Sequence, residues 1–192
     1  RSRLCVTSPL DPSPENWVDV ISEDPDAVLV GDVILDGPQL AEPLIVAIHT
    51  RHTVSEMTVR KLATGEIVST ITLPGAGSVG AASEKPQGGH EFWFSYTDHV
   101  RQSSVFKYDG VTGEVTQWAK PPGAVEPPAV KSQQITYTSR DGATVRMFII
   151  SKEEVPSTPL PTILYGYGGF NISQTPAFSP TRLAWLEQGG VY

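Results

Sequence analysis

Apolar and polar residues alternate in short runs along the first 120 residues, a pattern typical of β-strands with one exposed face. The clearest case is a hairpin that occurs twice. The segment "TVRKLATGEIVSTITLP" (58–74) matches "SVFKYDGVTGEVTQWAKP" (104–121), and each copy has two alternating runs around a Thr-Gly-Glu turn. The turn glycines, Gly65 and Gly113, lie 48 positions apart. The sequence therefore predicts a repeated β unit.

Two further segments precede each hairpin. They are "DAVLVGDVILDG" (26–37) and "PLIVAIHT" (43–50) in the first copy, and "SVGAASE" (78–84) and "HEFWFSYT" (90–97) in the second. An earlier segment, "NWVDVIS" (16–22), stands where the last strand of a preceding copy would stand. Each unit is therefore expected to have four strands: two apolar inner strands covered on both faces, and two outer strands with one face in water.

Four-stranded units that repeat at this spacing are typical of the blades of a β-propeller. A β-sandwich of about ten strands is the alternative that the pattern leaves open. Since single blades cannot bury their own faces, two and a half blades need further neighbours. Both ends of the chain look cut, and we expect the rest of the ring to precede residue 1.

The last third has a different pattern. A stiff connector with four prolines, "AKPPGAVEPPAV" (119–130), is followed by a hairpin at 132–152 whose turn contains Asp141-Gly142. The apolar run 162–165 predicts a buried strand. In the segment 179–190, Ser179 is a good N-cap, Pro180 suits the first helical position and Gly189 can end the helix. Strand, loop, helix and strand in this order predict a βαβ unit and a parallel sheet.

The loop of this unit, "GYGGFN" (166–171), is rich in glycine. A phosphate-binding loop would need a following lysine, and a dinucleotide fingerprint would need a third glycine that opens the helix directly. Neither is present. The oxyanion loop of an α/β-hydrolase, between its third strand and first helix, agrees with the order of the elements. A tyrosine hydroxyl here could donate to an oxyanion and a phenylalanine could line an apolar pocket. Alternatively, Tyr165, Tyr167 and Phe170 only anchor the loop in the core.

The segment "LYGYGGFNIS" (164–173) closely resembles the corresponding segment of prolyl oligopeptidases, which are serine peptidases that cleave small peptides after proline. The resemblance continues through "TPAFSPTRLAWLEQGGV" and reaches back to "TYTSRDGATVRMFII", and the repeats are similar to the last blades of that family's seven-bladed propeller. It implies a fold made of the last two to three blades of a β-propeller (1–121), a Pro-rich linker (122–131) and the N-terminal part of an α/β-hydrolase domain (132–192).

The resemblance also implies roles for two residues. Tyr167 would be the catalytic oxyanion donor and Phe170 would bind the substrate proline, while Tyr165 is interpreted as structural. The serine, aspartate and histidine of the triad follow the oxyanion loop in α/β-hydrolases, so we expect them outside this chain and expect the chain alone to be inactive. An oligopeptidase B-like enzyme specific for basic residues, or a non-catalytic propeller protein with a decayed hydrolase domain, are the alternatives.

Composition excludes little beyond this. The net charge of −7 argues against nucleic acid or an anionic membrane as partners, and no apolar run approaches the length of a transmembrane helix. The expected partners are short proline-containing peptides, with no cofactor, and we expect a monomer. A cytoplasmic location is the expectation, with a periplasmic or secreted one left open.

Other candidate residues are interpreted as structural. The lone Cys5 lies in an apolar run and is expected to be a small buried hydrophobe. No metal site is expected: His49 and His52 would face opposite ways on a strand, and the other two histidines, His90 and His99, lie at the two ends of another strand. Ser78 in "AGSVG" (76–80) resembles a nucleophile elbow but lies within a blade. The sequon "NIS" (171–173) is interpreted as chance.

Overall fold

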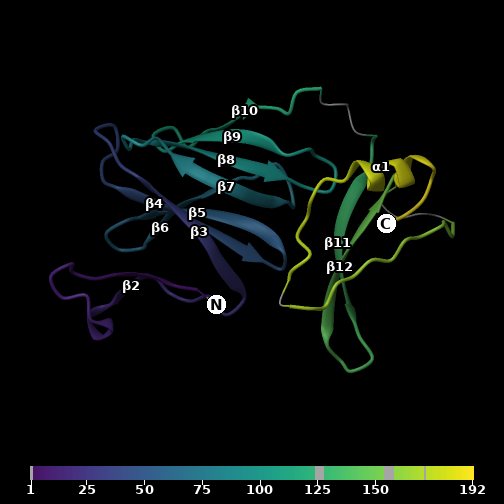
Figure 1. The fold of residues 1–192 in the computed structure, drawn as a ribbon, viewed down its shortest axis with the longest axis horizontal. Coiled ribbons are helices and arrows are strands. Elements are labelled where there is room, and N and C mark those ends of the chain that lie inside the picture. Colours follow the sequence, from purple (N-terminus) through teal and green to yellow (C-terminus); the bar gives the residue numbers. More distant parts are fainter. Residues whose placement is uncertain (1, 124–127, 154–157, 171) are drawn as a thin grey trace.

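The computed structural model describes residues 2–123, 128–153, 158–170 and 172–192. Its main body is a pair of four-stranded antiparallel sheets that pack against each other (Figure 1). The first sheet contains β3 (Ala27–Leu35), β4 (Leu44–Arg51), β5 (Val54–Lys61) and β6 (Ile67–Ile71), in that order. The second contains β7 (Ser78–Glu84), β8 (Glu91–Thr97), β9 (Ser104–Asp109) and β10 (Val115–Ala119), also in chain order. Both repeat units are therefore confirmed strand by strand.

A smaller sheet precedes them. It pairs β1 (Leu4–Val6) with β2 (Val18–Ile21), and a short 3-10 helix, η1 (Pro14–Asn16), lies between the two strands. The strand β2 falls within the segment 16–22, which the repeat predicted to be the last strand of an earlier unit. The N-terminal part is thus two complete propeller blades and the outer hairpin of a third.

One apolar core joins the two four-stranded sheets. Val46, Met57, Phe92, Phe94 and other apolar side chains from both sheets belong to this core. The strand β4 is buried along most of its length, as expected for an inner strand, and β6 and β10 are largely exposed. The innermost strands β3 and β7 differ from the expectation, because exposed residues interrupt their buried ones. They lie at a sheet edge, where only one side has a neighbouring strand.

The C-terminal part begins with the hairpin of β11 (Lys131–Thr138) and β12 (Thr144–Ser151), as predicted. Helix α1 (Pro180–Glu187) is also where the sequence placed it. The side chain of Ser179 accepts a hydrogen bond from the Arg182 amide, and Gly189 has a φ of +87° just after the helix. Leu183 and Leu186 of α1 pack on Ile150 of β12 and form a second, smaller core. No helix in the described ranges is long and apolar enough to cross a membrane.

The predicted buried strand at 162–165 is wrong in extent and in burial. Only Thr162 forms a bridge, a parallel one with Val191, and Leu164 is 81 % exposed. Residue Tyr192 next to it exchanges both backbone hydrogen bonds with Ile150 of β12. Within the described residues, the chain at 162 therefore has a neighbour on one edge only, which is too little to bury it. The parallel direction expected of a βαβ unit is confirmed by this one bridge.

The structure shows the predicted fold class: propeller blades followed by the first elements of an α/β-hydrolase domain. The predicted linker (122–131) includes residues 124–127, which lie outside the described residues. The domain limits at 121 and 131 stay predictions.

Candidate active site

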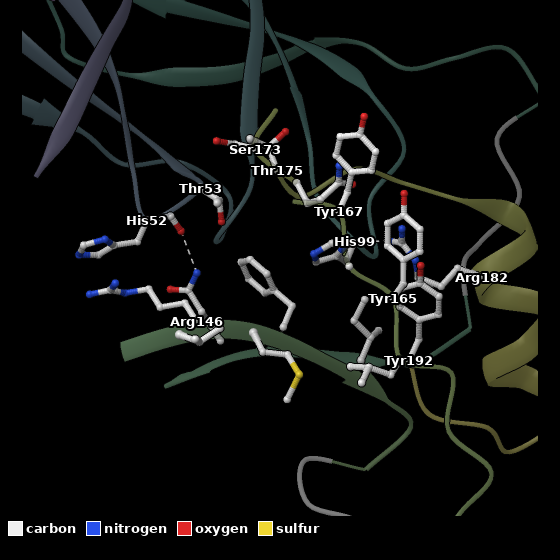
Figure 2. A pocket seen from close by; sticks show the side chains of 18 of the residues that line it. His52, Thr53, His99, Arg146, Tyr165, Tyr167, Ser173, Thr175, Arg182 and Tyr192 are labelled. Carbon is white, nitrogen blue, oxygen red and sulfur yellow. Dashed lines mark hydrogen bonds between the residues drawn. The ribbon is translucent and has the colours of Figure 1, made fainter. Parts of the chain in front are cut away.

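A cavity of about 790 Å³ lies between the two parts of the chain (Figure 2). On the blade side it is lined by His52 and Thr53, which form the turn between β4 and β5, and by His99, which follows β8. On the other side it is lined by the β11–β12 hairpin, by parts of the segment 164–175 and by residues of α1 and the C-terminal end. Residues far apart in the sequence thus meet at one concave surface.

Direct hydrogen bonds hold the two sides of the cavity together. Gln134 of β11 donates to the His52 carbonyl at 2.8 Å, and the Ser78 hydroxyl donates to the Pro176 carbonyl at 2.7 Å. The amide of Phe178 donates to the hydroxyl of Thr97 at 3.3 Å. The segment 173–178, which leads from the glycine loop to α1, is therefore hydrogen-bonded to the second blade. These bonds position the glycine loop at the cavity.

Tyr167 lines the cavity and its side chain is not buried in the protein. The residue is 46 % exposed, and Figure 2 shows it at the border of the cavity. A Cβ at Gly169 would lie 3.4 Å from the Tyr167 hydroxyl, an ordinary van der Waals distance, so the phenol oxygen lies close to the backbone of its own loop. The phenol oxygen is thus carried by a loop with little bulk around it, the arrangement that an oxyanion donor needs.

Phe170 occupies a different position. It has a φ of +55°, is 92 % exposed and is not among the residues that line the cavity. The amide of Ile172 closes a turn on the Gly169 carbonyl at 3.1 Å, so Phe170 is at the tip of the loop. Its predicted contact with a substrate proline therefore stays a prediction. The adjoining Asn171 of the sequon lies outside the described residues.

A chain of ring contacts extends from the glycine loop to the blades. Tyr165 stacks on Tyr192 with ring centroids 6.4 Å apart, and the Arg182 guanidinium lies 4.6 Å from the centre of the Tyr192 ring. The Arg182 Nη1 atom is 2.7 Å from Nδ1 of His99, whose ring packs edge-on against Phe148 of β12. Tyr165 thus lines the cavity beside Tyr192, and its structural interpretation stays a prediction.

His99 is neutral in this arrangement. Arginine can only donate, so Nδ1 of His99 accepts from Arg182 and the ring proton is on Nε2. The ring is 8 % exposed, and burial, followed by the nearby charge of Arg182, lowers the pKa of His99 to about 4, against the opposite effects of the Ala177 carbonyl and the Asp98 carboxylate. Within the described residues Nε2 has no hydrogen-bond partner. The histidine therefore joins the two parts of the chain without carrying charge at neutral pH.

Several other sequence candidates are placed away from catalysis. Ser78 lies in β7 and uses its hydroxyl to bind the Pro176 carbonyl, so it is not a nucleophile at an elbow. Cys5 is only partly buried, and its thiol donates to Asp19 at 3.2 Å, a bond that raises the pKa of the thiol. His49 is buried in β4, and burial lowers its pKa.

One group of potential metal ligands, His90, Glu91 and Asp109, occurs among the described residues. Both oxygens of Glu91 already bind ammonium groups, those of Lys85 and Lys107, at 2.7 Å each. These bonds hold the pKa of Glu91 at about 2. An ion would have to displace two lysines, so we interpret the group as an ion-pair cluster.

Comparisons with known proteins find relatives that match almost the whole chain. A curated prolyl endopeptidase from Elizabethkingia miricola is 33 % identical over 192 residues, which is 99 % of this chain. Prolyl oligopeptidase A from Amanita bisporigera is 30 % identical over 96 % of the chain. Among solved structures, one from a study of two prolyl endopeptidases matches 99 % of the chain with a TM-score of 0.81 and 28 % identity. The chain belongs to the prolyl oligopeptidase family. No family model matches it.

The chain spans about a quarter of the length of these family members: 26 % of the Elizabethkingia enzyme, 24 % of the Amanita enzyme and 27 % of the solved chain. A prolyl oligopeptidase B from Galerina marginata, solved with a 35-residue hydrolysis and macrocyclization substrate, has the same fold, with a TM-score of 0.80 and 24 % identity over 98 % of the chain. The two parts seen here are therefore arranged as in the family's solved structures.

Sequence reasoning missed the cavity residues outside the glycine loop. His52 and Thr53 have φ values of +51° and +70°, and neither is the glycine or asparagine that such a turn usually contains. Arg146 and Arg182 look like ordinary surface residues of a strand and a helix. The available signal was the two-residue gap between β4 and β5, which requires a tight turn but does not say what the turn contacts.

Proposed function

We propose that the chain is part of a serine-type endopeptidase that cleaves short peptides after proline through an acyl-enzyme. The single observation that supports this most is the position of Tyr167, which borders the cavity between the blades and the hydrolase elements. Family membership supports the reaction class. The domain limits proposed for it are blades at 1–121, a linker at 122–131 and the start of the hydrolase domain at 132–192.

In the proposed reaction a serine hydroxyl gives up its proton to a base, and its oxygen attacks the carbonyl carbon of the substrate proline, in the bond to be cleaved. The carbonyl oxygen becomes an oxyanion, and the Tyr167 hydroxyl donates a hydrogen bond to it. Collapse of this adduct expels the amine, which takes up a proton, and leaves an ester that water then hydrolyses. One such donor contributes about 2.7 to 4 kcal/mol to the stability of the transition state.

The triad is proposed to lie outside these residues. In α/β-hydrolases the serine, aspartate and histidine follow the oxyanion loop in that order. In the ranges that the structure describes, no serine hydroxyl is hydrogen-bonded to a histidine, and the buried histidine of the cavity, His99, is bound to Arg182 instead. Phe170 is proposed to contact the substrate proline from the tip of the loop. We therefore expect that the purified 192-residue chain does not cleave a proline-linked chromogenic peptide.

The test is a pair of matched substitutions in the full-length protein. Tyr167→Phe removes one hydroxyl and should lower kcat by about two to three orders of magnitude, with KM little changed, because the bond forms only in the transition state. Tyr165→Phe removes a hydroxyl two positions away and should change kcat by much less than tenfold. Equal losses in the two variants, or an intact Tyr167→Phe enzyme, would contradict the proposal.

A further inference from the structure

The cavity differs in charge from the rest of the molecule. The chain has 21 acidic and 14 basic residues, yet no Asp or Glu is among the described residues that line the cavity. Two arginines, Arg146 and Arg182, and two histidines line it instead. A second cavity, beside β2 and β4, shows the usual balance: its Arg51 is paired with Asp24 at 2.7 Å and with Glu56 at 3.1 Å. The absence of carboxylates is thus a property of the cavity that contains Tyr167.

Of the two arginines, Arg146 is the one available to a ligand. Arg182 donates to His99 and to the Ala177 carbonyl, at 2.7 and 3.0 Å, and stacks on Tyr192. Arg146 is exposed, and among the residues that the structure describes no hydrogen bond or ion pair reaches its side chain. Because side chains alternate along a strand, Arg146 is on the same face of β12 as Phe148, which packs against His99. Its guanidinium is thus held on the cavity side of the hairpin.

The opposite wall at this point is a strained turn. His52 and Thr53 both have positive φ, which is costly for a β-branched residue such as threonine. Strain of this kind persists where the surroundings hold it, often at functional sites, and here Gln134 binds the His52 carbonyl. Figure 2 shows the ring of His52 and the side chain of Arg146 at the same end of the cavity, on facing walls. The blades and the hairpin therefore form this end of the cavity together.

We propose that this end of the cavity binds a carboxylate of the peptide substrate through the Arg146 guanidinium. A guanidinium presents parallel N–H groups that suit a carboxylate, and the missing acidic residues leave no competing partner in the described wall. The carboxylate can be a glutamate or aspartate side chain or the free C-terminus of a short peptide. The inference rests on the proposed function for its peptide ligand. The same wall, with arginines and no carboxylate among its described residues, disfavours substrates with basic residues.

The experiment measures kcat/KM of the full-length enzyme on matched chromogenic peptides. One arm compares a free C-terminal carboxylate with its amide, and the other compares glutamate with glutamine at each position around the proline. We expect a two- to fivefold preference for the charged member in at least one arm, the size of one solvent-accessible ion pair. Arg146→Gln should bring that ratio to about one and Arg146→Lys should retain part of it, while added salt should weaken it in the unaltered enzyme.

The control is Arg140→Gln, which removes the same charge from the turn of the same hairpin, away from the cavity, and should keep the preference. Binding of labelled proline-free peptides, measured by anisotropy, repeats both arms without cleavage. An enzyme that cleaves none of the peptides but binds the charged ones through Arg146 would refute the proposed function alone. A ratio of one in the unaltered protein, a ratio that survives Arg146→Gln, or a preference for lysine would overturn the carboxylate site.

Discussion

The core between the two four-stranded sheets and residues 160–170 of the C-terminal segment differ in how far their apolar residues are buried. In the sheets, Ile45, Phe92 and Phe94 are at most 1 % exposed. In the C-terminal segment, Leu164 is 81 % and Phe170 is 92 % exposed. Backbone pairing differs in the same way, because each strand from β3 to β10 has a ladder while 162–165 has a single bridge. Both parts contain large apolar side chains, but only in the two sheets do neighbouring strands cover them.

Topology explains the difference. Each strand of a blade pairs with the next strand in the sequence, so a unit of about 45 residues contains all the partners of its strand ladders. A parallel strand takes its partners across a crossover, and Thr162 meets Val191 only after the whole loop and helix α1. Local pairing gives every strand of the two blades its hydrogen-bonded neighbours within the chain, and the core between the two sheets is buried. The C-terminal segment leaves its aromatic residues open, and some of these, such as Tyr165 and Tyr167, are then available to line a cavity.

The largest expected effect compares one phenylalanine from each part. Phe92→Ala removes a side chain that is 0 % exposed and should lower the free energy of unfolding by about 3 to 5 kcal/mol. Phe170→Ala makes the same change at the exposed tip of the loop and should stay within about 0.5 kcal/mol. Urea unfolding of the full-length protein measures both. Similar losses in the two variants would mean that the loop is packed in solution and that the comparison is wrong.

The second effect concerns the contact that joins the two parts. In an unfolded chain histidine titrates near 6.5, whereas burial and Arg182 lower the pKa of His99 to about 4. Between these values the unfolded state binds a proton that the folded state does not, so stability is complete above about pH 6.5 and falls as the pH decreases to 4. At about 1.4 kcal/mol per pH unit the loss reaches about 3 kcal/mol.

Carboxylates also make stability depend on pH. The contribution of His99 is therefore obtained as the difference between the unaltered protein and variants of the His99–Arg182 contact. Unfolding free energies from pH 4 to 7.5 should show a shallower dependence in His99→Gln, where the side chain cannot titrate. In Arg182→Gln the nearest cation is gone, so the pKa of His99 should rise and its share of the pH dependence should shrink. Identical pH profiles in all three proteins would show that His99 is not buried between the two parts.

The sequence predicted the parts of the fold that are specified locally. Thr-Gly-Glu turns, the Asp141-Gly142 turn and the Ser179 cap each depend on residues within a few positions, and all three are where they were expected. The burial of 162–165 was mispredicted because an apolar run shows only that a strand could be covered. Coverage depends on partners distant in the sequence, and the described residues supply one.

The residues of the candidate site also differ in whether local sequence features or contacts between distant elements reveal them. The glycine loop was found because its composition and its place between a strand and a helix are local features, whereas Tyr167 was singled out by the resemblance to prolyl oligopeptidases, and its role has yet to be tested. His99 and Arg146 could not be found, since their importance comes from which elements face each other across the cavity. A histidine beside an arginine 83 positions away leaves no pattern in the sequence.

The smallest effect tests how far the two copies of the repeat are equivalent. Gly65 and Gly113 occupy matching turns with φ of +72° and +75°, so alanine is strained at both, by about 1 kcal/mol. A Cβ at Gly65 would also overlap the carbonyl oxygen of Val20 in β2, whereas at Gly113 it would meet nothing within 4 Å. Gly65→Ala should therefore cost about 1 to 3 kcal/mol more than Gly113→Ala, because the neighbouring strand has to move. The difference in urea midpoint between the two variants measures it. Equal midpoints would show that β2 does not pack on the first complete blade, and the burial seen among the blades would then end at β3.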